Sequence, residues 1–247
     1  MKSSRDNVEI EKKIIEWLHQ YLTNSGCKGF IVAVSGGIDS CVTAVLCRRV
    51  TEATLALILP CGPMSTEDVE DAINVIKTFK IEHRTYDLTP AFEAMLSTLT
   101  ADRNAPVTIP LANIKARLRM VTLYYEANRL DRLVVGTGNR TELALGFFTK
   151  YGDGGVDLLP LGNLLKREVQ ELGVHLGLPH TIITKTPSPG LWPGQTDEGE
   201  LGASYDQLDD LVSGHTTHGL TKTEIKRLQS RISRNLHKRK LPPICPL

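Results

Sequence analysis

The chain has 247 residues, of which 41% are apolar and 23% are charged, and its formal net charge is +1. This length allows one large domain or two small ones, and the apolar content is sufficient for a full core. The small net charge argues against a protein built to bind nucleic-acid backbones, because such proteins carry a marked basic excess.

Other global features point to a cytoplasmic protein. No apolar run approaches the length of a membrane span, and residues 1–7 lack the apolar core of a signal peptide. The five cysteines include no Cys-x-x-Cys pair, so ordinary buried thiols in a reduced compartment are favoured over a disulfide or metal site. We therefore expect neither a membrane nor a nucleic-acid partner.

The first predicted elements are a long amphipathic helix and a short buried strand. Apolar side chains recur at helical spacing over residues 8–23. Residues 30–34 are all apolar, and four of them are aromatic or β-branched, which is typical of a strand in a parallel sheet. A polar turn over residues 35–40 follows, and then an apolar helix over residues 41–50.

The polar turn has the features of an anion site. Gly36 and Gly37 permit a tight turn, and its amides lie at the positive end of the following helix. It lacks the lysine of a Walker A loop, and it adds Asp39, a carboxylate placed where Mg²⁺ would bridge to phosphate. The alternative is that Asp39 or Ser40 merely caps the helix. The run Ser-Gly-Gly-Ile-Asp-Ser resembles the signature of ATP pyrophosphatases, which split ATP between its α and β phosphates and adenylate a substrate.

Strands and helices continue to alternate along the chain. We predict further strands at residues 55–59, 85–88 and 133–135, and further helices at 65–79, 90–99, 111–130, 165–176, 204–213 and 222–238. This alternation predicts an α/β fold with a doubly wound parallel sheet flanked by helices, as in the Rossmann-like adenine nucleotide alpha hydrolases. Ligands bind such sheets beyond the carboxyl ends of the strands, so the turns at 35–40 and 136–139 are expected to face one cleft.

Motifs beyond the turn resemble the NAD synthetase family over nearly the whole chain. They lie in family order at residues 113–120, 136–142, 147–157 and 194–202. The resemblance implies a two-step reaction. ATP adenylates the nicotinate carboxylate of deamido-NAD and releases pyrophosphate, and ammonia then displaces AMP to give NAD. Catalysis of this kind depends mainly on positioning and charge neutralisation.

The resemblance also implies a set of ATP contacts. Asp39 and Glu142 match the family's Mg²⁺ ligands, and Asp39, Lys166 and Ser188 are the expected catalytic residues. Taken alone, Glu142 and Lys166 are equally consistent with solvated charges on surface helices. The expected ATP-binding residues are Ala33, Val34, Ser35, Gly36, Gly37, Ile38, Asp39, Ser40, Thr137, Lys166 and Ser188.

A second set matches positions that hold deamido-NAD in the family. Arg117 is a charged residue on an apolar helix, where it needs a partner. The alternative for His237 is a frayed basic helix at the C-terminus, and for the aromatic residues it is a place in the core. The expected substrate-binding residues are Arg117, Lys150, Asp157, His237 and Lys238, with Phe148 and, from a neighbouring subunit, Tyr21 and Tyr124 as stacking surfaces.

The family works as a homodimer with its active site at the subunit interface, which makes the helices at 8–23 and 111–130 candidate dimer surfaces. The Pro/Gly-rich segment at 184–202 is too long for a plain connection. By the resemblance, residues 185–201 would close over the acyl-adenylate and exclude water.

Free ammonia is the expected nitrogen donor. Residues 1–247 are expected to form a single synthetase domain, because the first strand begins about thirty residues in and leaves no space for a glutaminase domain. A separate glutaminase subunit is the alternative source of ammonia. The rival functions are another ATP pyrophosphatase, such as a GMP synthetase subunit or a tRNA-modifying enzyme, and a non-catalytic nucleotide-binding protein of the universal stress type.

Overall fold

A computed structural model describes residues 6–62, 66–99, 108–188, 190 and 194–246. Four parallel strands form its sheet, in the order β3-β2-β1-β4. They are β1 (Phe30–Ala33), β2 (Thr54–Ile58), β3 (Glu82–Thr85) and β4 (Leu133–Val135). A parallel bridge from Val135 to Leu158 extends the sheet beyond β4. The predicted doubly wound parallel sheet is therefore confirmed.

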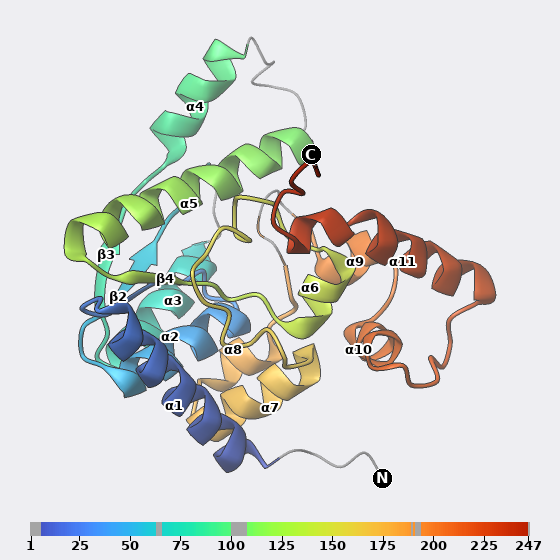
Figure 1. The fold of residues 1–247 in the computed structure, drawn as a ribbon, viewed down its shortest axis with the longest axis horizontal. Helices are drawn as coiled ribbons and strands as arrows, with labels where there is room; N and C mark the ends of the chain where they lie inside the picture. Colours follow the sequence, from blue (N-terminus) through green and yellow to red (C-terminus); the bar gives the residue numbers. More distant parts are fainter. Residues whose placement is uncertain (1–5, 63–65, 100–107, 189, 191–193, 247) are drawn as a thin grey trace.

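Helices cover both faces of the sheet (Figure 1). Phe30 and Val32 of β1 pack into a core with helices α1 (Asn7–Ser25), α2 (Ile38–Val50), α3 (Thr66–Thr78), α7 (Lys166–Leu176) and α8 (His180–Thr184). Ile31 points to the opposite face and packs with Leu123 of α5 (Ile109–Leu130). The alternation along β1 follows from the two-residue period of a strand. Because both faces are covered, every residue of β1 is apolar.

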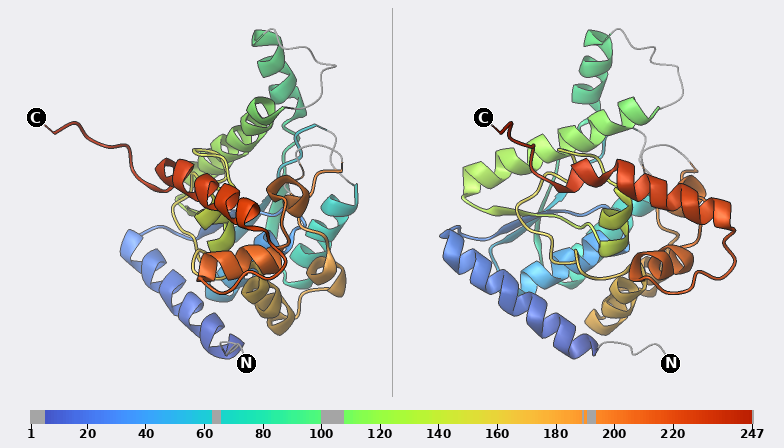
Figure 2. Two further views of the ribbon diagram at one scale, coloured as in Figure 1. Left: turned by 90° about the vertical axis from the view of Figure 1, so that its right-hand side faces the viewer. Right: turned by 45° about the vertical axis from the view of Figure 1, so that its right-hand side comes forward.

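The C-terminal third, together with α6, adds a smaller helical group beside the sheet. It contains α6 (Arg140–Leu145), α9 (Asp197–Leu201), α10 (Tyr205–Ser213), α11 (Lys222–Arg234) and the 3-10 turn η1 (Leu236–Arg239). Buried side chains of α6, α9, α10 and α11 share one cluster, which holds α10 and α11 against α6. Helix α4 (Thr89–Thr98) lies at the periphery, where Phe92 and Leu96 share an apolar cluster with side chains from the first half of α5 (Figures 1 and 2).

Most helix boundaries follow local capping signals. In α1, the Asp6 side chain accepts a hydrogen bond from the Val8 amide at 2.9 Å, and the helix ends at Gly26 in the left-handed conformation. Pro110 lies in the first turn of α5, which begins two residues before the predicted start at residue 111. Proline is tolerated there because its missing amide has no partner in a first turn.

Three predictions about secondary structure were wrong. The third strand is β3 at Glu82–Thr85, not residues 85–88. It is an edge strand with largely exposed side chains, so it shows no apolar alternation. The short helices α6, α8 and α9 were not predicted, since five or six residues carry too little periodicity. The last helix ends at Arg234, which places His237 and Lys238 in η1.

Two further sequence expectations concern cysteines and membranes. All five cysteines are free thiols. Cys41, Cys47 and Cys61 are buried, whereas Cys27 is half-buried and Cys245 is exposed, so the prediction of buried thiols holds for three of the five. Burial raises the pKa of the Cys41 thiol to about 12, which keeps it protonated and unreactive. Within the described ranges, no helix is both long and apolar enough to cross a membrane.

A buried carboxylate ties α5 to the sheet edge. The Glu126 side chain is 1% exposed and accepts hydrogen bonds from Tyr86 Oη at 2.6 Å and from Arg84 and Arg129, both at 2.7 Å. Burial disfavours its charge, but the hydrogen bonds from Tyr86 and Arg129 outweigh this effect and hold the pKa of Glu126 below its usual 4.5.

We expect Glu126→Gln to lower the free energy of unfolding at pH 7 by about 1–3 kcal/mol, because charge-assisted hydrogen bonds are lost. A carboxyl whose pKa is lower in the folded state stabilises above its unfolded pKa, and this stability is lost as the pH falls through the folded pKa. The difference between wild type and variant should therefore shrink between about pH 5 and pH 3. Urea unfolding across this range measures it, and a difference independent of pH would contradict the prediction. Exposed Glu16→Gln is the control.

Candidate functional site

The polar turn after β1 lies at the switch point of the sheet, where the strand order changes direction between β1 and β4. Ser40 organises this turn. Its hydroxyl donates to the Gly37 carbonyl at 2.8 Å and accepts from the Ser35 amide at 3.1 Å. The helix α2 begins at Ile38, three residues earlier than predicted, and no side chain caps it. The first amides of α2 are thus available to an anion.

Gly36 is required by the turn geometry. Its φ is +82°, and a Cβ built on it would lie 2.3 Å from the carbonyl oxygen of Asp68 in α3. Close approach of the α3 backbone and a left-handed conformation therefore both exclude a side chain at this position.

Asp39 binds partners from distant parts of the chain. One carboxylate oxygen forms an ion pair with Lys166 Nζ at the start of α7, and the other accepts from Asn139 Nδ2 at 2.9 Å. The side chains of Lys166 and Asp39 are 3% and 15% exposed. Asp39 is therefore neither a helix cap nor a solvated charge, and Lys166 is not a solvated surface lysine.

Glu142 stands beside this pair in the first turn of α6. Its carboxylate accepts from the Asn139 amide at 3.0 Å, and the Asn139 side chain accepts from the Glu142 amide at 2.9 Å. This reciprocal cap fixes the start of α6 directly after β4. Burial and the nearby charge of Asp39 raise the pKa of Glu142 well above 4.5.

Asp197 and Tyr205 complete the surroundings of Lys166. Tyr205 Oη donates to Asp197 at 2.5 Å, and the Tyr205 ring centroid is 5.0 Å from Lys166 Nζ. Burial favours the neutral amine of Lys166, but the charges of Asp39 and Glu142 hold its pKa above 10.5. Burial raises the pKa of Asp197.

The cluster of Asp39, Glu142, Asp197 and Lys166 has more acidic than basic groups. Within the part of the chain that the structure describes, Asp197 Oδ1 is buried without a hydrogen-bond partner. In the described part of the chain, no group of three or more His, Cys, Asp or Glu side chains is arranged to hold a metal ion. A cation bound here therefore needs oxygen atoms from a ligand as well as from the protein.

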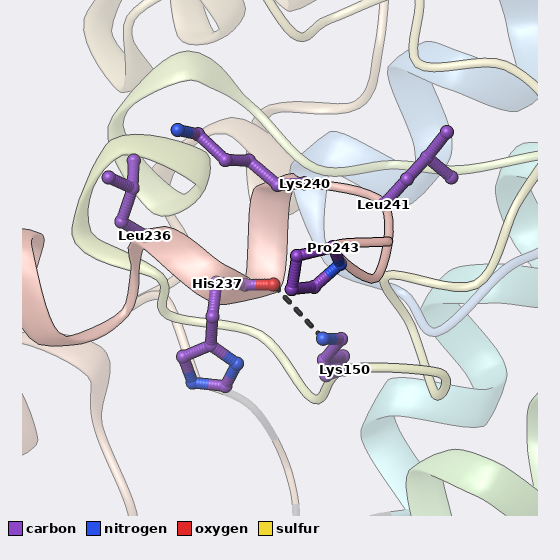
Figure 3. Close-up of a pocket in the computed structure, with 6 residues that line it drawn as sticks. All are labelled: Lys150, Leu236, His237, Lys240, Leu241 and Pro243. Carbon is purple, nitrogen blue, oxygen red and sulfur yellow. Dashed lines mark hydrogen bonds between the residues drawn. The ribbon is translucent and has the colours of Figure 1, made fainter. Parts of the chain in front are cut away.

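A second group of predicted residues lines a pocket where η1 meets the loop after α6. This pocket has a volume of about 440 Å³ and includes Phe148, Lys150 and Lys238. Lys238 Nζ donates to the carbonyls of Gly146 and Phe148, both at 2.8 Å. His237 lines an adjoining pocket of about 290 Å³. The backbone carbonyl of His237 accepts a hydrogen bond from Lys150 Nζ at 3.0 Å (Figure 3).

The predicted residues Arg117 and Asp157 have partners within the chain. Arg117 donates to the carbonyl of Lys150 at 3.3 Å and so adjoins the second group. Asp157 accepts from Tyr124 Oη at 2.8 Å and from the Val134 amide at 2.8 Å. Tyr124 is thus held by Asp157 of its own chain.

The remaining predicted residues lie elsewhere. Tyr21 is 48% exposed on α1, where its ring contacts Trp17 with centroids 5.1 Å apart. Thr137 follows β4, on the approach to Asn139. Ser188 is exposed, and its hydroxyl accepts from the Gly190 amide at 3.1 Å.

Ser188 belongs to the Pro/Gly-rich segment at residues 184–202. Residues 189 and 191–193 of this segment lie outside the described residues. Lys185 anchors its start through ion pairs with Asp68 at 2.5 Å and Asp71 at 2.6 Å in α3. Farther along, the Asp197 amide donates to the Pro187 carbonyl at 3.1 Å. The base of this segment thus contacts both the α3 helix and the Lys166 cluster.

Sequence reasoning missed Asn139, Asp197 and Tyr205 as site residues. Asn139 and Asp197 lie inside motifs that pointed to the family, so a check of every polar motif residue would have included them. Tyr205 lies outside these motifs, and its place under Lys166 depends on how α10 packs on α7.

A parallel sheet with an amide-rich turn and a carboxylate–lysine cluster at its switch point defines an α/β protein that binds a phosphorylated nucleotide. Comparison with known proteins gives the family. The NAD synthase family model matches residues 10–242, so the chain belongs to this family.

Individual relatives agree with this assignment. The NH(3)-dependent NAD(+) synthetase of Carboxydothermus hydrogenoformans is 45% identical over 239 residues, which cover 96% of each chain. The enzyme of the same name from Archaeoglobus fulgidus is 41% identical, also over 96% of each chain. The solved structure of NMN synthetase from Francisella tularensis superposes with a TM-score of 0.92 at 39% identity, covering 98% of this chain and 100% of that one.

Proposed function

We propose that this protein is an ammonia-dependent NAD(+) synthetase, a ligase of NAD biosynthesis. In the first step, the nicotinate carboxylate of deamido-NAD attacks the α-phosphorus of ATP and pyrophosphate leaves. In the second, ammonia attacks the acyl carbon, AMP leaves and a proton is lost to solvent. The observation that carries this proposal is the pairing of Asp39 with Lys166 beside Glu142 at the switch point, in a chain of the NAD synthase family.

The ATP half of the site is assigned to the turn after β1. The amides at the start of α2 bind phosphate, and Lys166 neutralises charge as pyrophosphate departs. Ser188 approaches the nucleotide from the segment anchored by Lys185. Thr137 contacts ATP from the turn after β4. The other residues that we assign to ATP binding are Ala33, Val34, Ser35, Gly36, Gly37, Ile38, Asp39 and Ser40.

Mg²⁺ fits beside Asp39 and Glu142. Both supply hard oxygen atoms, and Asp197 places a third carboxylate nearby, whose Oδ1 accepts no hydrogen bond from the described residues. Mg²⁺ is commonly held by one or two carboxylates with substrate phosphates, so Asp39 and Glu142 would be sufficient as protein ligands. When bound, the ion supplies charge neutralisation of the triphosphate.

The deamido-NAD half of the site is assigned to the pocket near η1. Lys150, Lys238 and Arg117 bring positive charge to this region, which suits a phosphate-bearing substrate. His237 lines the adjoining pocket, and Phe148 offers an aromatic surface for the pyridine ring. Asp157 and Tyr124 act as one hydrogen-bonded unit. Tyr21 and Tyr124 are assigned as stacking surfaces in the partner subunit's site.

Homodimer formation is part of this proposal. Val121 and Tyr125 of α5 are 59% and 64% exposed, and Trp17 and Tyr21 expose aromatic surface on α1. Such apolar side chains are suited to a subunit interface. Sedimentation at micromolar concentration should give twice the chain mass, and a monomer would contradict homodimer formation.

Residues 1–247 act as one domain in the cytoplasm, where free thiols persist.

A second candidate substrate is nicotinic acid mononucleotide, whose amidation gives NMN. The observation that favours it is the similarity of the fold to a solved NMN synthetase, with a TM-score of 0.92. Both substrates present the same nicotinate carboxylate and nearby phosphate, so the ATP half of the site serves either one.

The test is an assay of amide formation with ATP and Mg²⁺. Deamido-NAD and nicotinic acid mononucleotide are offered separately, each with ammonium or with glutamine. We expect NAD and AMP in equal amounts from deamido-NAD and ammonium, and no product with glutamine alone. If only nicotinic acid mononucleotide gives product, this mononucleotide replaces deamido-NAD as the proposed substrate. No product in any arm would overturn the substrate assignment.

A further inference from the structure

Asp209 is a fully buried carboxylate on α10 that lies outside both proposed substrate sites. It is 0% exposed, and its two oxygens contact two other helices. Oδ1 accepts from Thr141 Oγ1 at 2.5 Å and from the Lys166 amide at 3.3 Å. Oδ2 accepts from the Arg167 amide at 3.0 Å and lies 3.3 Å from Arg167 Nε.

These contacts make Asp209 the cap of α7. Residue Leu165 occupies the N-cap position and offers no side-chain oxygen, so the first amides of α7 need acceptors from elsewhere. A carboxylate is well placed at a helix N-terminus, where it meets both the free amides and the positive end of the dipole. Asp209 thus holds the backbone of Lys166 from a separate helix.

The same carboxylate also reaches the helix that carries Glu142. Thr141 directly precedes Glu142 in α6, and its hydroxyl is buried against Asp209. One side chain therefore connects the start of α6 with the start of α7. The relative placement of Glu142 and Lys166 depends on this connection, because each residue lies in the first turn of its helix.

Lys166 is held by α10 at both of its ends. Tyr205 and Asp209 are four residues apart, so they lie on one face of α10. Tyr205 places its ring 5.0 Å from Lys166 Nζ, and Asp209 accepts from the Lys166 amide. The backbone and the ammonium of Lys166 are fixed by the same helix face, which directs the ammonium to Asp39.

We propose that Asp209 is a positioning residue for the adenylation step: it sets Lys166 and Glu142 at their working distance around Asp39. This inference rests on the proposed function, since it assigns the Asp39 cluster to ATP. Asp209 touches neither ATP nor the nicotinate substrate in this assignment. Its effect on catalysis is transmitted through the first turns of α6 and α7.

The test compares Asp209→Asn with Asp210→Asn. Asparagine keeps the shape of Asp209 but presents only one acceptor oxygen to the four donors. Asp210 is the matched control, because it lies on the same helix, loses the same charge and pairs with the same Arg167, at 2.7 Å. The readouts are kcat and KM for amide formation, together with the affinity for Mg·ATP by titration calorimetry.

For Asp209→Asn we expect kcat to fall roughly 10- to 100-fold, because a small misplacement of catalytic groups has an effect of this size. KM for deamido-NAD should stay within about twofold, since its pocket is formed by other residues. Mg·ATP affinity should fall several-fold. Asp210→Asn should stay within about twofold of wild type in all three quantities, because Asp210 contacts the Arg167 guanidinium whereas the first amides of α7 donate to Asp209. A purely structural role would instead lower the fraction of active enzyme and leave kcat per folded molecule unchanged.

Two outcomes would overturn the proposal: Asp209→Asn with wild-type kcat and ATP affinity, or equal losses in Asp209→Asn and Asp210→Asn. If Asp209→Asn does not fold, Thr141→Val removes the contact with α6 alone and should lower kcat by about 3- to 10-fold. A Thr141→Val enzyme with unchanged kcat would then overturn the proposal. The calorimetric arm needs no nicotinate substrate. If the wild-type protein binds Mg·ATP but makes no NAD, the proposed function is refuted. The role of Asp209 can still be tested in that case by the effect of Asp209→Asn on Mg·ATP affinity.

Discussion

Replacing Asp39 by asparagine is expected to lower ATP-dependent amide formation by at least about 100-fold. The variant removes the negative partner of Lys166 and one of the two carboxylates assigned to Mg²⁺. Asparagine preserves the volume and one acceptor oxygen for Asn139, so the fold should persist. The measurement is AMP release together with NAD formation, normalised to folded protein by circular dichroism.

Glu52→Gln is the control for the Asp39 variant. Glu52 also lies next to α2, but at the opposite end from Asp39, and its side chain is 92% exposed. This substitution should leave the rate within about twofold, because exposed ion pairs contribute little. An Asp39→Asn protein with wild-type turnover would refute the assignment of the catalytic cluster. Unchanged ATP binding with no turnover in either wild type or variant would favour the non-catalytic nucleotide-binding class.

Replacing Gly36 by alanine is expected to destabilise the protein by about 2–4 kcal/mol and to abolish most ATP turnover. The added Cβ would lie 2.3 Å from the Asp68 carbonyl oxygen, and the position has a φ of +82°. Either the phosphate-binding turn or α3 must move to relieve the contact. Because α3 also anchors Lys185, the movement should disturb the segment that carries Ser188.

Gly37→Ala is the matched comparison for stability. Its Cβ would have Ser35 Oγ at 3.5 Å as its nearest neighbour, which is an ordinary contact, and its φ of −82° suits any residue. We expect its free energy of unfolding to stay within about 1 kcal/mol of wild type. Chemical unfolding of the two variants measures the difference. Equal stabilities for Gly36→Ala and Gly37→Ala would contradict the role assigned to the α3 contact.

The sequence was sufficient for the features that local patterns encode. Long helices such as α1 and α5 and the buried strands β1, β2 and β4 were predicted because their burial imposes a period or an apolar run on neighbouring residues. The turn at residues 35–40 was predicted to be an anion site from its glycines and its position before a helix, and the structure places it at the switch point of the sheet. The edge strand β3 lies at Glu82–Thr85, but it was predicted at residues 85–88. Its side chains are largely exposed, so they show no two-residue apolar period.

The tertiary structure alone decided which direct contacts join the polar residues of the site. Asp39 and Lys166 are 127 residues apart, and their ion pair depends on the packing of α7 beside α2. The two adjacent glycines are equivalent in the sequence, yet only Gly36 lies against the α3 backbone. Asp209 carries no local signal of function, since its partners are the first amides of another helix. Local periodicity records which face of an element is buried, whereas the partners on that face are set by long-range packing.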